Sequence, residues 1–141
     1  MKTNKIIWLL VMIIIMVSSC TSRQDAETNR GIQTETEGNM IYVSITSAQA
    51  KQLMDTESDY VILDVRTEEE YNESHIPNAV LIPDYEIMEK AEQVLPDKDQ
   101  LILVYCRSGR RSKNASQALA ELGYTNIKEF GGIIDWPYET E

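Results

Sequence analysis

Short apolar segments alternate with amphipathic segments from residue 40 onward, and this alternation most narrows the folds that the chain can adopt. We predict strands over residues 41–45, 60–65, 79–82, 101–105 and 126–130. Capping boxes at Thr46 and Thr67 begin two helices, and residues 84–94 and 112–122 form two more. The pattern predicts an α/β fold with a mainly parallel central sheet of about five strands, flanked by helices on both faces.

The N-terminal residues have the pattern of an export signal. Lys2 and Lys5 precede an apolar stretch over residues 6–17, which is too short to span a bilayer comfortably, and small residues then lead to Cys20. A cysteine after small residues, with an aliphatic residue three positions before it, resembles the bacterial lipobox. The resemblance implies a lipoprotein signal peptide over residues 1–19 and lipid attachment at Cys20. The domain would then be exported and anchored to a bacterial membrane, facing the periplasm or the cell exterior; a retained membrane anchor is the alternative.

Residues 20–39 are polar and contain almost nothing apolar, so we expect them to form a flexible tether behind the lipidated cysteine. Residues 40–141 have the size of one compact domain of about 100 residues, expected to be monomeric.

The formal net charge is −10, and −12 once Lys2 and Lys5 are removed with the signal, which argues against nucleic acid as a partner. The sequence shows no zinc-ligand spacing and no glycine-rich nucleotide loop, so no metal or cofactor is expected.

Cys106 follows directly after the predicted strand 101–105 and stands before a helix. A loop in that place directs backbone N–H groups and the positive end of the helix dipole at one point, which stabilises a thiolate or a bound anion. Gly109 supplies the conformational freedom that such a loop needs. The chain has two cysteines, so lipidation of Cys20 would leave Cys106 without an intramolecular disulfide partner. We interpret Cys106 as a reactive nucleophile; the alternative is a buried, inert thiol.

The basic residues Arg107, Arg110, Arg111 and Lys113 surround this cysteine in a chain that is otherwise acidic. Cations at the start of a helix oppose its dipole, so their concentration here indicates an anion-binding site. The alternative is a solvated helix start, as charge runs usually are.

Four segments, in this order, resemble the single-domain rhodaneses, and the similarity runs through residues 42–136. They are Asp64-Val65-Arg66 with Glu70-Tyr71 and His75-Ile76-Pro77-Asn78-Ala79, then Cys106-Arg107-Ser108-Gly109-Arg110-Arg111-Ser112, then Gly123-Tyr124, and finally Gly131-Gly132 with Trp136. Ser74 and Asn78 depart from the family pattern, which often has glycine at these positions.

The resemblance implies sulfur transfer through a persulfide on the catalytic Cys106. A small sulfur-donor anion such as thiosulfate would supply the sulfur, and cyanide in the test tube or a thiol in the cell would accept it. A thiol reductase is an expected partner, because an exported thiolate is exposed to oxidants. The implied donor-binding residues are Arg107, Ser108, Gly109, Arg110, Arg111, Ser112 and Arg66.

Some of these residues have simpler interpretations. Asp64 and Arg66 follow a neighbouring strand and could face the same pocket, but we favour a pair of ion-paired residues that tie that strand end to Glu70 or to the loop. His75 is the only histidine, and we interpret it as structural rather than as a general base.

Two other functions stay open. Phosphatases and arsenate reductases use a cysteine loop with an arginine six positions after the cysteine, where this chain has Ser112. A non-catalytic module that binds a partner, or senses sulfur species through Cys106, is the other alternative.

Overall fold

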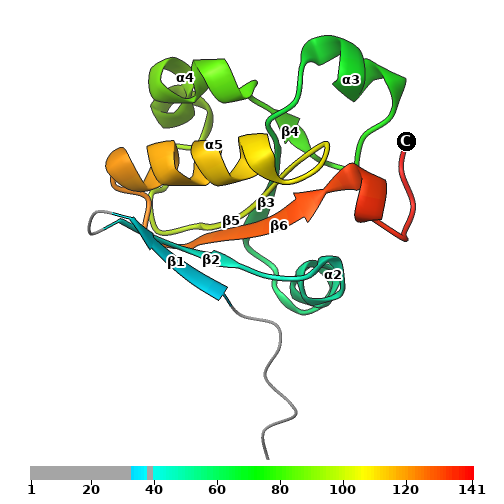
Figure 1. The fold of residues 1–141 in the computed structure, drawn as a ribbon, viewed down its shortest axis with the longest axis horizontal. Coiled ribbons are helices and arrows are strands. Elements are labelled where there is room, and N and C mark those ends of the chain that lie inside the picture. Colours follow the sequence, from blue (N-terminus) through cyan, green and yellow to red (C-terminus); the bar gives the residue numbers. More distant parts are fainter. Residues whose placement is uncertain (1–32, 38–39) are drawn as a thin grey trace, which may run out of the picture. The chain divides into compact units, whose positions relative to one another are not determined.

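A single sheet of six strands organises residues 33–37 and 40–141, which the computed structural model describes (Figure 1). The strand order is β1-β2-β6-β5-β3-β4, and the five strands from β2 to β4 in this order are parallel. This confirms the predicted α/β class and the mainly parallel sheet of about five strands. The strands are β1 (Gln33–Glu37), β2 (Met40–Ser44), β3 (Tyr60–Asp64), β4 (Val80–Leu81), β5 (Leu101–Cys106) and β6 (Ile127–Gly132).

Strand β1 lies in the stretch that the sequence assigns to the tether. It pairs antiparallel with β2, from Gln33 opposite Ser44 to Glu37 opposite Met40. An edge strand is held by backbone hydrogen bonds and needs no apolar side chains, so its polar sequence gave no signal of burial. The sheet therefore begins before residue 40, whereas the predicted signal peptide and Cys20 lie outside the described residues.

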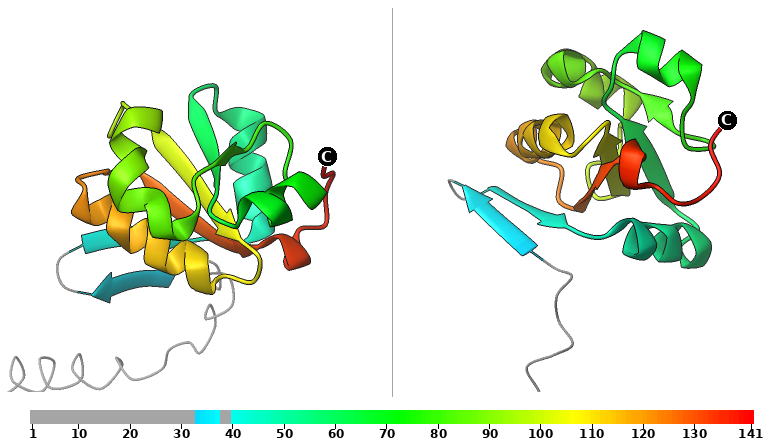
Figure 2. Two further views of the ribbon diagram at one scale, coloured as in Figure 1. Left: turned by 90° about the horizontal axis from the view of Figure 1, so that it is seen from above. Right: turned by 45° about the vertical axis from the view of Figure 1, so that its right-hand side comes forward.

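Helices cover both faces of the sheet (Figures 1 and 2). Helix α2 (Ser47–Thr56) lies on one face, and α4 (Ile87–Val94) and α5 (Arg110–Glu121) lie on the other. The short helix α3 (Glu68–Glu73) and the 3₁₀ turns η2 (Asp84–Glu86) and η3 (Ile133–Asp135) complete the structure. Thr46 and Thr67 form the capping boxes that their sequences predict, with Gln49 and Glu70 respectively.

The buried strand β5 contributes alternate side chains to two cores. Ile102, Val104 and Cys106 pack with the α4 and α5 face, whereas Leu103 and Tyr105 pack with the α2 face. Every residue of β5 is buried, as expected for a central strand of a parallel sheet. The alternation places the sulfur of Cys106 on the α5 side, next to the start of that helix.

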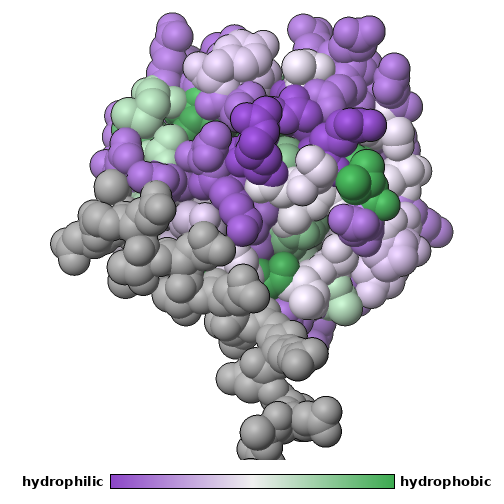
Figure 3. All heavy atoms as spheres, viewed as in Figure 1, coloured by the Kyte–Doolittle hydropathy of each residue, from purple (hydrophilic) through white to green (hydrophobic). Residues whose placement is uncertain are grey.

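The side of the molecule seen in Figure 3 is mostly hydrophilic, with small hydrophobic patches among the described residues. Within residues 33–37 and 40–141, no helix combines the length and the hydropathy needed to cross a membrane.

Candidate active site

Cys106 is the last residue of β5, and its side chain is only 1% exposed. The N–H of Gly109 donates to the Cys106 sulfur at 3.1 Å, and the Ser112 hydroxyl oxygen lies 3.5 Å from the same sulfur. Gly109 has a φ of 101°, a left-handed conformation that glycine adopts without strain. Because Gly109 is already the N-cap, α5 begins at Arg110 rather than at the predicted Ser112, and Ser112 falls within its first turn.

These contacts stabilise the ionised sulfur. Burial raises the pKa of the Cys106 thiol, but hydrogen bonds from the Ser112 hydroxyl and from the N–H groups of Ser112, Gly109 and Ser108 lower it by more. The net effect is a pKa below the ordinary value of a cysteine. Such a thiol is a stronger nucleophile near neutral pH than an ordinary buried cysteine.

The structure adds a residue that the sequence analysis missed, Glu129 on β6. Its carboxyl group is buried, with 2% exposure, and accepts from the Ser112 hydroxyl at 2.6 Å. The N–H of Gly131 and the hydroxyl of Ser44 also donate to it, at 2.8 Å and 3.1 Å. A glutamate inside a strand that borders the core was the one signal in the sequence, but nothing there related it to Cys106.

Gly132, at the end of β6, supports the loop from behind. A Cβ atom at this position would lie 2.1 Å from the carbonyl oxygen of Arg107 and 2.5 Å from the Cα of Ser108. Only glycine permits the two backbones to approach so closely. The N–H of Ile134 also donates to the Arg107 carbonyl at 3.3 Å, so the segment after β6 holds the first loop residue.

The three arginines of the loop have different environments. Arg107 and Arg110 are exposed, and no carboxylate in residues 33–37 and 40–141 forms an ion pair with either side chain. The Arg111 guanidinium instead binds both carboxylate oxygens of Glu70 on α3, each at 2.7 Å. This pairing lowers the pKa of Glu70 to about 2. Among the described residues, Arg107 and Arg110 therefore keep guanidinium groups without an ion-pair partner, while Arg111 joins α5 to α3.

Arg66 forms an ion pair with Asp64 and ties the strand end to the turn after α3, rather than to Glu70, which binds Arg111. Its Nη2 lies 2.6 Å from Oδ2 of Asp64 and donates to the Ser74 carbonyl at 2.7 Å. Asp64 and Arg66 are 0% and 5% exposed, so the pair is a buried tie between β3 and the turn after α3. This geometry favours a structural role for Arg66 over the donor contact that the resemblance implies.

His75 has the structural environment that we predicted. Its ring stacks on Tyr71, and its Nδ1 lies 3.0 Å from the Tyr71 carbonyl. Nearby, Asn78 adopts a φ of 65°, which explains why glycine suits that position, whereas Ser74 is extended at −173° and needs no glycine.

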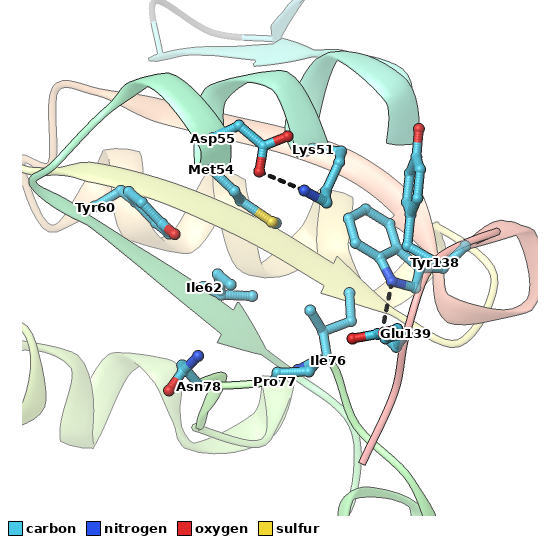
Figure 4. Close-up of a pocket in the computed structure, with 11 residues that line it drawn as sticks. Lys51, Met54, Asp55, Tyr60, Ile62, Ile76, Pro77, Asn78, Tyr138 and Glu139 are labelled. Carbon is cyan, nitrogen blue, oxygen red and sulfur yellow. Dashed lines mark hydrogen bonds and ion pairs between the residues drawn. The ribbon is translucent and has the colours of Figure 1, made fainter.

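A separate cavity of about 510 Å³ lies on the α2 side of the sheet (Figure 4). Ile62 and Ile76 in its wall belong to the α2-side core, whereas Cys106 belongs to the α5-side core, so the thiol does not line it. Lys51 and Asp55, which both come from α2 and line the cavity, form an ion pair. The lining residues are Lys51, Met54, Asp55, Tyr60, Ile62, Ile76, Pro77, Asn78, Trp136, Tyr138 and Glu139.

Comparisons with known proteins agree with this architecture. Thiosulfate sulfurtransferase PspE of Escherichia coli is 40% identical over 73 residues, which cover 52% of this chain and 70% of PspE. Putative sulfurtransferase YtwF of Bacillus subtilis is 37% identical over 97 residues, covering 69% of this chain and 92% of YtwF.

Solved structures show the same fold. A rhodanese-related protein from Thermoplasma volcanium matches 71% of this chain and 98% of its own, with 32% identity and a TM-score of 0.62. A structure described as a rhodanese with anions from E. coli matches 58% of this chain and 96% of its own, with 35% identity and a TM-score of 0.55. Residues 46–137 match the family described as Rhodanese-like domain, and they include β3 to β6 and the whole Cys106 loop. This chain is therefore a member of the rhodanese-like family.

Proposed function

We propose that this protein is a sulfurtransferase that carries a sulfane sulfur as a persulfide on Cys106. The observation that supports this most directly is the buried thiol with a lowered pKa, surrounded by the N–H groups of Ser108, Gly109 and Ser112. Relatives that are 35% to 40% identical carry the name thiosulfate sulfurtransferase, which makes thiosulfate the first donor to test.

In the first half of the reaction, the Cys106 thiolate attacks the outer sulfur of thiosulfate. The new bond joins the two sulfurs, the sulfur–sulfur bond of the donor breaks, and sulfite leaves with its electron pair. The product is a cysteine persulfide anion, which the same N–H groups stabilise. In the second half, cyanide or a thiolate attacks the outer sulfur and Cys106 leaves as the thiolate.

Arg107 and Arg110 serve the donor rather than the sulfur itself. Their unpaired guanidinium groups attract a dianion to the mouth of the loop and stabilise the departing sulfite. Arg111 contributes less directly, because its guanidinium is held by Glu70.

The arrangement argues against phosphatase or arsenate reductase activity. Those enzymes need an arginine six positions after the cysteine, and here that position is Ser112, whose side chain is fully buried and bonded to Glu129. No long cation can occupy that position to hold a phosphate.

Intact-mass analysis tests the proposal. The full chain, purified in detergent, is treated with thiosulfate and compared with the Cys106→Ser variant. We expect the native chain alone to gain the mass of one sulfur, and cyanide to remove it as thiocyanate. If no sulfur is gained, the protein is not a thiosulfate sulfurtransferase, and the non-catalytic binding or sensing module becomes the better description.

The same proposal includes the place of action. An apolar N-terminal segment ending at Cys20 supports export, lipid attachment at Cys20 and a domain facing the periplasm or cell exterior. There a thiol reductase partner would return oxidised Cys106 to the thiolate. Expression with a labelled fatty acid should label the native chain but not the Cys20→Ser variant, and equal labelling of both would exclude attachment at this residue.

A further inference from the structure

The hydroxyl of Ser112 has one hydrogen but several neighbours that could receive it. The oxygens of Glu129, Gly109 and Gly131 lie 2.6, 2.9 and 3.3 Å from the Ser112 oxygen, and the Cys106 sulfur lies at 3.5 Å. A serine hydroxyl donates one hydrogen bond and accepts up to two. The direction of its single O–H bond therefore decides which neighbour is stabilised as an anion.

Two arrangements of the hydrogens give each of the side chains of Cys106, Ser112 and Glu129 a hydrogen-bond partner among the three. In the first, Glu129 is ionised and receives the Ser112 hydrogen, while the Cys106 thiol donates its own hydrogen to the Ser112 oxygen. In the second, Glu129 carries a proton and donates it to the Ser112 oxygen, while the Ser112 hydrogen turns to a Cys106 thiolate. The two arrangements contain the same number of protons. They differ only in where the hydrogens of Cys106, Ser112 and Glu129 lie.

We propose that Glu129 receives the thiol proton of Cys106 through Ser112, so that the thiol and the carboxyl group share one proton over a range of pH. In this step the S–H bond of Cys106 breaks as a new O–H bond forms on Ser112. The original Ser112 O–H bond breaks as one forms on Glu129. The inference deepens the proposed sulfurtransferase function and rests on it for its biological meaning, although the proton transfer can be observed without any sulfur donor.

The surroundings of Glu129 favour such an exchange. The carboxyl group is 2% exposed, and the groups that donate to it are the hydroxyls of Ser44 and Ser112 and the N–H of Gly131, all of them neutral. No ion pair formed within residues 33–37 and 40–141 includes Glu129, and a buried negative charge without a cation is costly in free energy. The negative charge then moves to the sulfur, where the positive end of α5 and several N–H groups receive it.

Other charged groups face the thiol from neighbouring elements. Arg111 on α5 interacts electrostatically with Cys106, with Glu70 on α3 and with Asp84 on η2. Glu70 is held ionised by Arg111, so it does not take the thiol proton. Among the residues that the structure describes, Glu129 is the carboxyl group that hydrogen bonds connect, by way of Ser112, to the Cys106 sulfur.

The test is the rate at which the Cys106 thiolate reacts with iodoacetamide, followed by mass spectrometry of the Cys106 peptide from about pH 4 to pH 10. If Cys106 and Glu129 share one proton, the rate of the native chain should rise with pH in two steps. Between the steps this pair of groups holds one proton over a range of pH, so the rate should form a plateau and change less than about twofold. In Glu129→Gln, which has nearly the same shape, the plateau should disappear. The rate should then fall about tenfold for each pH unit below a single midpoint.

Two further variants separate proton transfer from support of the loop. Ser112→Ala removes the connecting hydroxyl and should also give one step. Ser44→Ala removes a hydrogen bond to the far oxygen of Glu129 but leaves the path intact, so it should retain the plateau. A single-step profile in the native chain, or an unchanged plateau in Glu129→Gln, would overturn the inference.

The outcome can be distinguished from failure of the proposed function. If the native chain shows the plateau but gains no sulfur from thiosulfate, the proton path is supported and the sulfurtransferase function is rejected. If the native chain gains sulfur but has the same single-step profile as Glu129→Gln, the sulfurtransferase function is supported and the role of Glu129 is rejected.

Discussion

The close approach of Gly132 to the Cys106 loop gives the sharpest test of how the site is built. Replacing Gly132 with alanine would place a methyl group 2.1 Å from the Arg107 carbonyl oxygen and 2.4 Å from its carbon. Cβ atoms are essentially never found closer than 3.0 Å to another heavy atom, so the two backbones must separate by roughly 1 Å. Both contacts are backbone atoms, so no side chain can rotate away to make room.

We expect Gly132→Ala to lower the free energy of unfolding by about 1–3 kcal/mol, the range for overfilled sites. The larger effect should be on catalysis, because a displacement of about 1 Å at reacting groups can reduce rates about 100-fold. The assay is the rate of persulfide formation from thiosulfate, measured with the melting temperature of the same preparation.

Gly123→Ala is the matched control. Gly123 follows the far end of α5 with a φ of 90°, and within 4 Å an added Cβ would meet only Cδ of the Lys98 side chain, at 3.9 Å. It should lose about 1 kcal/mol of stability from backbone strain and keep nearly full activity. If Gly132→Ala kept a persulfide rate within about threefold of this control, the argument that Gly132 shapes the loop would be refuted.

Three other predictions concern charge and backbone conformation around the site. Glu70→Gln keeps the α3 cap but removes the ionic bond to Arg111. This substitution should lower the free energy of unfolding by about 1 kcal/mol at pH 7. The difference in denaturation midpoint between variant and native chain should shrink as the pH falls from 4.5 through about 2, where Glu70 of the native chain becomes protonated. A difference that persists below that range would contradict a stabilising ionic bond between Glu70 and Arg111. Asn78→Ala should lose about 1 kcal/mol in urea unfolding because of its positive φ, whereas Asn78→Gly should lose nothing, and equal losses would exclude strain as the cause. Arg107→Gln and Arg110→Gln should each raise the KM for thiosulfate about fivefold without changing the melting temperature, and an unchanged KM in both would remove them from the donor site.

The order of strands and helices was predictable because each buried segment carries its own signal. Strand β5 is a continuous apolar run, and Thr46 and Thr67 each stand three residues before a side chain that completes a capping box. The position of Cys106 followed from this order, since it comes directly after the apolar run. These signals are local, and the fold did not contradict them.

Features that depend on distant pairing were not predictable in the same way. Strand β1 is polar and is recognised only by its hydrogen bonds to β2. Glu129 reaches Ser112 because β6 lies beside β5, a proximity between residues 17 apart that no periodicity shows. The bond between Arg111 and Glu70 joins residues 41 apart, so the sequence could not separate Arg111 from the two exposed arginines of the loop.

The complete burial of β5 has a consequence for the sulfur transfer proposed above. Cys106 ends a strand with no exposed residue, and Gly109 and Ser112 hold its side chain from the other side. A persulfide would extend beyond this fixed point by one sulfur–sulfur bond of about 2 Å. Such a persulfide could not swing from one partner to another in the manner of a carrier arm. In the proposed reaction, donor and acceptor would therefore have to reach the same buried sulfur in turn.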